Sequence, residues 1–308
     1  LTSQLKNDAI KESTPIHYES VTKETGTNND RQSITLIATK NAKELRDYIS
    51  LNDRKSSKKI ELDQDGVVIS ERLSQLSDVK VGDTLSYQDS QDVKRTVKVS
   101  GICQMYTGHF IFMNQSNYEK VYHQDYTSNA YLVNLKNSSV DNTKDQAVKF
   151  MNLKATKGVV QNTTMTTLID VIVTSLNKIM IVLILVAILL GTVILYNLTN
   201  INVSERIREL STIKVLGFYD PEVTMYIYRE TIVLSAIGIV VGWLIGMALH
   251  SYILAVVPPD EVMFNPTKWL GAYVIPLIVI TVISYVLKYV VNHKLKKVDM
   301  LEALKSVD

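Results

Sequence analysis

The stretch IMIVLILVAILLGTVILY, Ile179–Tyr196, is an unbroken apolar run that begins directly after Lys178, and no charged residue follows it until Glu205. A helix needs about 20 apolar residues to cross the ~30 Å hydrocarbon core of a bilayer, and this run with its flanks is long enough. Two further runs of the same kind follow, at residues 231–257 and 269–287. The sequence therefore predicts a membrane protein with three transmembrane helices.

Lysine and arginine are distributed unevenly among the segments that flank these spans. The loop between the first two spans holds four of them and the C-terminal tail holds five, whereas the loop at 258–268 has Lys268 alone. Because Lys and Arg favour the cytoplasmic side, we expect the first loop and the tail to be cytoplasmic and residues 1–177 to lie outside the cell. A domain of that size must be translocated, so we expect a further span or signal upstream of Leu1.

The N-terminal part of the chain has the pattern of a folded domain. Short apolar or β-branched runs alternate with helical patterns, from SITLIA at Ser33 to TKDQAVKFMN at Thr143. This alternation is typical of a compact α+β domain, here an extracytoplasmic one whose N-terminus is expected to be incomplete. From Thr164 the periodicity becomes helical, which predicts a stalk helix that continues into the first span.

Motifs for catalysis, metals and nucleotides are missing from the sequence. The five histidines show no metal-ligand spacing, and the single cysteine, Cys103, can form no intrachain disulfide and is expected in the core. GxSxG and GxxxxGK[ST] patterns are absent too. We therefore predict no catalytic residue, no metal and no cofactor in this chain. A net charge of +2, with 21% charged residues, argues against a nucleic-acid-binding protein.

The stretch NINVSERIRELSTIKVLGFYDPE, Asn200–Glu222, is heavily charged although it lies between two spans. At helical spacing, one face carries Val203, Ile207, Leu210 and Ile213. The charged side chains cover the rest of the helix: Glu205, Arg206, Arg208 and Glu209. The pattern predicts a rigid amphipathic helix along the cytoplasmic side of the membrane.

The ends of this helix have capping signals. Asn202 followed by Glu205 is typical of a capping box, and Gly217 suits a left-handed helix end. Asp220 as N-cap and Pro221 at the first helical position would then start the next helix. Two roles fit such a helix: a docking surface for a soluble protein, or an amphipathic anchor in the lipid headgroups. The acidic Glu205 and Glu209 favour docking.

Glycine and proline mark the second and third spans. Gly238, Gly242 and Gly246 recur every four residues, a ridge that permits close approach of another helix, either within one subunit or across a dimer. Pro276 is expected to kink the third span. His250 lacks the partners that a proton relay needs, so we expect it to face water or a carbonyl near the outer end of its span.

The segment ERIRELSTIKVLGF closely resembles the cytoplasmic helix of FtsX-like/MacB-like ABC transporter permeases, with its E-R-x-R-E-[IL]-x-x-[KR]-x-[LM]-G pattern. VISERLSQLSDVKVGDTL and VSGICQMYTGHFIFM resemble the extracytoplasmic domain of these permeases, and KKVDMLEALKS resembles their tail. The likeness is to large permeases of low-GC Gram-positive bacteria. It implies the order of one span, a large outside domain and three further spans.

The resemblance implies a multi-pass permease of the bacterial cell membrane that works by mechanotransmission. A separate ABC ATPase, which binds ATP and Mg²⁺, would drive movement of the outside domain, for export of a peptide or lipid or for control of a partner such as a cell-wall hydrolase. Other partners implied are membrane lipid and a second permease module, as homodimer or tandem copy. The residues expected to couple the ATPase are these: Glu205, Arg206, Ile207, Arg208, Glu209, Leu210, Lys214 and Gly217.

A membrane-anchored receptor or binding module without ATPase coupling is the alternative function. The predicted organisation is the same for both. It consists of an extracytoplasmic domain (1–163), a stalk helix (164–178), transmembrane helices (179–200, 221–257 and 269–288), a coupling helix and turn (201–220), an extracytoplasmic loop (258–268) and a cytoplasmic tail (289–308).

Overall fold

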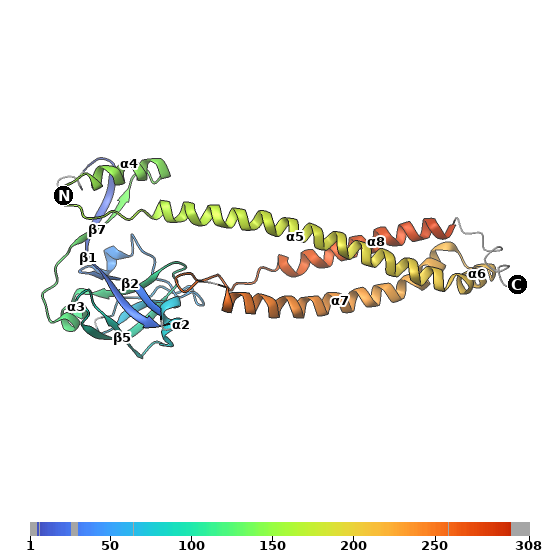
Figure 1. Cartoon of the computed structure of the whole chain (residues 1–308), viewed down its shortest axis with the longest axis horizontal. Helices are drawn as coiled ribbons and strands as arrows, with labels where there is room; N and C mark the ends of the chain where they lie inside the picture. The colour runs from blue at the N-terminus through green and yellow to red at the C-terminus, as the bar shows by residue number, and fades with distance from the viewer. Residues whose placement is uncertain (1–4, 6, 26–29, 64, 258, 297–308) are drawn as a thin grey trace. The chain divides into compact units, whose positions relative to one another are not determined.

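The computed structural model describes residues 5, 7–25, 30–63, 65–257 and 259–296 (Figure 1). They form two compact units. The first unit contains Leu1–Leu168 and also Val256–Asn265, and the second contains Ile169–Ala255 and Pro266–Asp308. The chain therefore passes between the units three times, and a short segment from between the last two spans belongs to the N-terminal unit.

A seven-stranded sheet forms the first unit, in the order β2-β6-β3-β5-β4-β1-β7. The strands are β1 (Ile10–Thr25), β2 (Asp30–Thr39), β3 (Val67–Ser70), β4 (Thr84–Gln88), β5 (Lys94–Cys103), β6 (His109–Asn114) and β7 (Ala130–Leu135). The pairs β2–β6 and β3–β5 are parallel, whereas β3–β6 and β4–β5 are antiparallel. The mixed sheet with interspersed helices confirms the predicted α+β class.

The long strand β1 closes this sheet into a ring. Its second half pairs antiparallel with β2, in register from Ile16↔Thr39 to Thr25↔Asp30. On its other side it pairs with β4 and, through its first half, with β7. Six strands, β1 to β6, therefore form a barrel, and β7 extends the sheet beyond it. A closed barrel leaves no free edge among its strands.

Alternating residues of the strands fill the barrel, because successive side chains of a strand point to opposite faces. The inward set shares complete or nearly complete burial: Val21, Ile34, Leu36, Ala38, Val67, Ile69, Leu85, Tyr87, Val97, Val99, Ile111 and Met113. Leu73, Tyr118 and Tyr122 from two helices complete this core. The opposite face of β2, β3 and β6 presents Ile37, Val68 and Phe112, which pack with Cys103, Leu45 and Leu51 in a second cluster. Cys103 lies in the core, as predicted.

Four helices accompany the sheet, and side chains cap three of them. They are α1 (Ala42–Leu45), α2 (Glu71–Ser77), α3 (Gln115–Tyr122) and α4 (Val140–Met151). Asn41, Asn114 and Ser139 accept hydrogen bonds from backbone N–H groups at the starts of α1, α3 and α4. Ser70 lies before α2 but uses its Oγ differently, to accept from the backbone N–H of Phe110 at 3.1 Å.

The second unit consists of helices. These are α5 (Asn162–Glu205), α6 (Ile207–Val215), α7 (Asp220–Val256) and α8 (Gly271–Lys296), with α6 at the end where α5 finishes (Figure 1). Within the described residues, three segments are long and apolar enough to cross a membrane: Asp170–Glu205, Pro221–Val256 and Gly271–His293. The three predicted spans are thus found, and α5 runs from the predicted stalk into the first span without a break.

The predicted start of the cytoplasmic helix is wrong. Asn202 is no cap, because it lies inside α5, which continues to Glu205. The break falls at Arg206, with φ −103° and ψ 14°. Burial of Thr199 and Val203 against neighbouring helices favours this extension, which local capping propensity does not register.

The other end of that helix agrees better with the sequence. Gly217 has a φ of +99°, the left-handed conformation predicted for the helix end. The next helix starts at Asp220, one residue before its predicted first position, and the Glu222 carboxylate accepts the backbone N–H of Tyr219 at 2.9 Å. The side chain of Asp220, which was predicted to cap this helix, lies outside what the structure describes, as does the tail from residue 297 onwards.

Candidate functional site

The apolar face of α6 is buried against three other helices. Leu210 is fully buried, and Val203 near the end of α5 is 6% exposed. They form one cluster with residues of α7 and α8: Val223, Tyr228, Leu287 and Val291. Ile213 packs at the edge of the cluster, together with Leu195 of α5. The amphipathic pattern in the sequence therefore describes a face that packs on protein.

Two side chains attach α6 to α7, one at the α5–α6 junction and one on α6 itself. Arg206 Nη2 lies 2.9 Å from Glu230 Oε2, in an ion pair whose partners are 40% and 47% exposed. Glu209 Oε1 accepts a hydrogen bond from the Tyr226 hydroxyl at 2.9 Å. An exposed ion pair contributes little by itself, about 0–1 kcal/mol, so these contacts orient α6 more than they stabilise it.

The remaining predicted coupling residues differ in exposure. Glu205 and Arg208 are exposed, whereas Ile207 and Lys214 are half-buried. Leu210 is therefore buried in the helix cluster, Arg206 and Glu209 contact α7, and Glu205 and Arg208 form an exposed polar surface. Sequence periodicity identified the apolar face correctly but could not tell which charged residues contact α7.

An exposed apolar group at the end of α6 was missed by sequence reasoning. Val215, Leu216, Phe218 and Tyr219 surround Gly217 and are 65%, 73%, 53% and 76% exposed. The signal was present in the sequence as four large apolar residues beside a glycine, at the end of a charged segment. We call these four residues the apolar tip. Exposed apolar groups of this kind are typical of contact with a partner or with membrane.

The glycine ridge of α7 makes no contact in the described part of this chain. A Cβ atom added at Gly238, Gly242 or Gly246 would meet nothing within 4 Å. The ridge is therefore open among the described residues, and its packing within one subunit or across a dimer stays a prediction. Elsewhere α7 does contact α8, where the rings of Trp243 and Tyr273 meet edge to face with centroids 6.2 Å apart.

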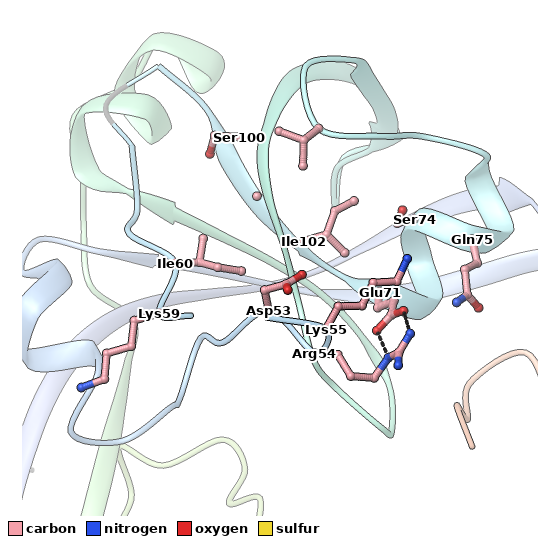
Figure 2. A pocket seen from close by; sticks show the side chains of 12 residues that line it. Asp53, Arg54, Lys55, Lys59, Ile60, Glu71, Ser74, Gln75, Ser100 and Ile102 are labelled. Carbon is pink, nitrogen blue, oxygen red and sulfur yellow. Dashed lines mark hydrogen bonds and ion pairs between the residues drawn. The ribbon is translucent and has the colours of Figure 1, made fainter. Parts of the chain in front are cut away.

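The barrel domain has an open pocket of about 590 Å³ between the segment around Arg54 and helix α2. Arg54 forms a two-pronged ion pair with Glu71, at 2.8 and 2.9 Å (Figure 2). Lys59 lies across the hollow from this pair (Figure 2). Because Arg54 and Glu71 satisfy each other, the pocket presents no unpaired buried charge that would select a ligand. Within the described residues, no cluster of His, Cys, Asp and Glu could hold a metal ion.

The helical part of the chain matches a known protein family. The family model described as FtsX-like permease C-terminal matches residues 181–293, which include α6 and most of the three spans. Among solved structures, the chain is similar to one titled as the crystal structure of the extracellular domain of the noncanonic ABC-type transporter YknZ from Gram-positive bacteria. The two sequences are 15% identical. The match covers 47% of this chain and 75% of that one, with a TM-score of 0.29. A search of curated proteins finds no match.

The long apolar helices and the barrel unit define a multi-pass membrane protein with a separate folded domain. Its helical part is an FtsX-like permease domain, the membrane component of an ABC transporter. The resemblance recognised in the segment ERIRELSTIKVLGF is thereby confirmed.

Proposed function

We propose that this permease works by mechanotransmission. A separate ABC ATPase binds α6, ATP-driven changes in that ATPase displace α6, and α5 carries the displacement to the domain outside the cell. The output is export of a peptide or lipid, or control of an extracytoplasmic partner such as a cell-wall hydrolase. ATP and Mg²⁺ are bound by the ATPase and not by this chain.

The observation that carries this proposal is the burial of α6 against all three spans. Leu210 and its neighbours join α6 to α5, α7 and α8 in one cluster. Protein interiors are close-packed, so a displacement at one side of such a cluster is transmitted to the other side. A force on α6 would therefore move the ends of three helices together, which a loosely attached loop could not do.

The surface available to the ATPase combines charge with apolar area. Glu205 at the end of α5 and Arg208 of α6 are exposed, and the apolar tip lies at the other end of α6. Protein interfaces typically have an apolar centre surrounded by polar groups. The acidic residues and the packed apolar face both oppose the alternative of a lipid anchor, which would need its apolar face free for the membrane.

We also propose that the active unit contains two permease modules, as a homodimer or a tandem pair. The glycine ridge of α7 supports this, because close approach of a second helix needs a surface without side chains and this one is open. The placement of the N-terminal domain outside the cell rests on the Lys and Arg distribution and agrees with a permease of this family.

The test is a charge reversal at Arg208, measured in membranes that contain the ATPase. Arg208→Glu should reduce ATPase copurification by tenfold or more, because placing like charges opposite each other across an interface costs several kcal/mol. Lys154→Glu is the matched control, with the same charge change at an exposed residue of the N-terminal unit. Both variants should insert normally.

Two results would overturn the proposal. One is normal copurification and normal ATP turnover with Arg208→Glu and with a second variant in which the apolar tip carries Leu216→Ser. The other is the absence of any P-loop ATPase after gentle solubilisation of the native membrane, which would favour a receptor or binding module.

A further inference from the structure

The segment between the second and third spans is bound to the barrel domain. We call Val256–Asn265 the docking loop; it belongs to the N-terminal unit, although the rest of that unit ends at Leu168. A connection between two spans, with two prolines and two acids, would ordinarily be expected to lie free in solvent. Three separate parts of the barrel domain contact it instead.

The first contact is a short piece of antiparallel sheet. Thr107, just before β6, forms a bridge with Val262 of the docking loop. Gly108 donates its N–H to the Glu261 carbonyl at 2.8 Å, and Met263 donates its N–H to the Tyr106 carbonyl at 2.9 Å. These two backbone hydrogen bonds, one on each side of the Thr107–Val262 pair, fix the register of the loop on the domain.

The geometry of Gly108 suits this contact. Its φ is +75°, a conformation that side chains rarely permit, and an added Cβ would lie 3.0 Å from the ring of Phe110. Met263 is 7% exposed, so the loop also buries an apolar side chain. The contact therefore combines backbone pairing with burial.

The second and third contacts converge on Asp260. Arg72 of α2 donates from Nε to the Asp260 carbonyl at 3.1 Å and from Nη2 to the Pro259 carbonyl at 3.4 Å. Its Nη2 also lies 3.5 Å from Asp260 Oδ1, and the Arg72 side chain is only 13% exposed. Gln32 of β2 donates from Nε2 to Asp260 Oδ2 at 3.2 Å. A planar guanidinium that reaches two carbonyls and a carboxylate positions the loop more strongly than one exposed ion pair does.

The docking loop is joined closely to two spans. Val256 is both the last residue of α7 and the first residue of the loop, and only residues 266–270 separate the loop from α8. We propose that the docking loop is a permanent attachment of the outside domain to α7 and α8, with Arg72 as its positioning residue. The domain is then connected to the membrane at the stalk end of α5 and also at the ends of the other two spans.

The attachment has a mechanical consequence beyond the proposed function, in which α5 alone carries movement. A domain held by a single helix can swing freely, whereas one that is also held through the docking loop must move α7 and α8 with it. The docking itself does not depend on any ATPase, although its role in carrying movement does rest on the proposed function.

The test of docking is a disulfide between Thr107→Cys and Val262→Cys. This is a non-hydrogen-bonded antiparallel pair, for which Cα atoms are about 4.5 Å apart, within the range that a disulfide spans. Burial raises the pKa of the native Cys103 thiol to about 12, so it stays protonated and does not compete. The control pair is Thr107→Cys with Val257→Cys, on an exposed residue of the same loop.

Under mild oxidation of membranes without ATPase, the Thr107/Val262 pair should cross-link at least about tenfold faster than the control pair. Adding Arg72→Ala should slow the cross-linking by about tenfold. Gln32→Ala removes one hydrogen bond to the loop and should slow cross-linking by a smaller factor. This second variant still tests the docking if Arg72→Ala misfolds. Arg31→Ala is the matched control, because it breaks an exposed Arg31–Asp92 pair away from the loop and should change nothing.

Equal rates for the two cysteine pairs, or cross-linking that is insensitive to Arg72→Ala, would refute the docking without bearing on the ATPase. With the ATPase present, the cross-link should form equally in nucleotide-free and vanadate-trapped membranes, and the locked protein should keep its coupled ATP turnover. Cross-linking in one state only, or loss of coupling on locking, would show that the loop detaches during the cycle and would overturn a permanent attachment.

Discussion

Replacing Leu210 by alanine should detach α6 from the spans while leaving its outer surface intact. Leu210 is fully buried in the cluster that joins α5, α6, α7 and α8. Truncating a fully buried leucine costs about 2–5 kcal/mol, from lost burial and from the cavity that remains. Because α6 has nine residues, and helices shorter than about 12–15 residues are marginal by themselves, the helix depends on this packing.

The expected loss, about 3 kcal/mol, corresponds to roughly a hundredfold increase in the equilibrium constant for local opening. Amide hydrogen exchange in lipid nanodiscs should therefore accelerate by that factor in residues 207–215 and remain unchanged in the interior of α7. Val215→Ala is the matched control, on the same helix and 65% exposed, and should alter exchange by less than about threefold.

The same variant separates docking from coupling. Glu205 and Arg208 remain exposed in Leu210→Ala, so the ATPase should still copurify, but its turnover should no longer respond to the permease. If exchange in α6 changes no more than in Val215→Ala, the cluster does not hold the helix, and the transmission argument fails. If exchange accelerates as expected while coupling stays normal, α6 is packed as described but is not the coupling element.

Three further outcomes follow from the structure. Asp89→Asn should lower the stability of the barrel domain by about 3 kcal/mol, measured by thermal unfolding of the whole chain. It breaks a buried ion pair, because Asp89 is 3% exposed, Arg95 is 17% exposed and the two side chains lie 2.8 Å apart. His109 is buried, and burial lowers the pKa of its ring below 6.5, although the negative charge of Glu261 acts to raise that pKa. The unfolded chain therefore binds a proton that the native domain does not, and stability should fall as the pH drops below about 6.5; His109→Phe should flatten this dependence. Gly242→Leu should weaken assembly of two modules in native gels without affecting insertion, and unchanged assembly would mean that the glycine ridge faces lipid.

The sequence determined the features that depend on local pattern. Three long apolar runs identified the spans, since a bilayer requires continuous apolar segments of that length. Short apolar runs identified β2, β3, β5 and β6, whose inward residues recur at every second position. The apolar face of α6 was found for the same reason, because one side of a short helix packs against one surface throughout.

The features decided by tertiary structure are those in which one segment meets two environments. Strand β1 was not predicted, because its buried apolar residues, Ile10, Ile16 and Val21, keep no regular spacing. Its first half pairs with β7 and its second half with β2. The extension of α5 to Glu205 depends on neighbours from α7 and α8, and the docking of the loop depends on Arg72, nearly 190 positions away from Asp260. Local patterns register the average surroundings of a segment, whereas such contacts exist only once the chain has brought distant parts together.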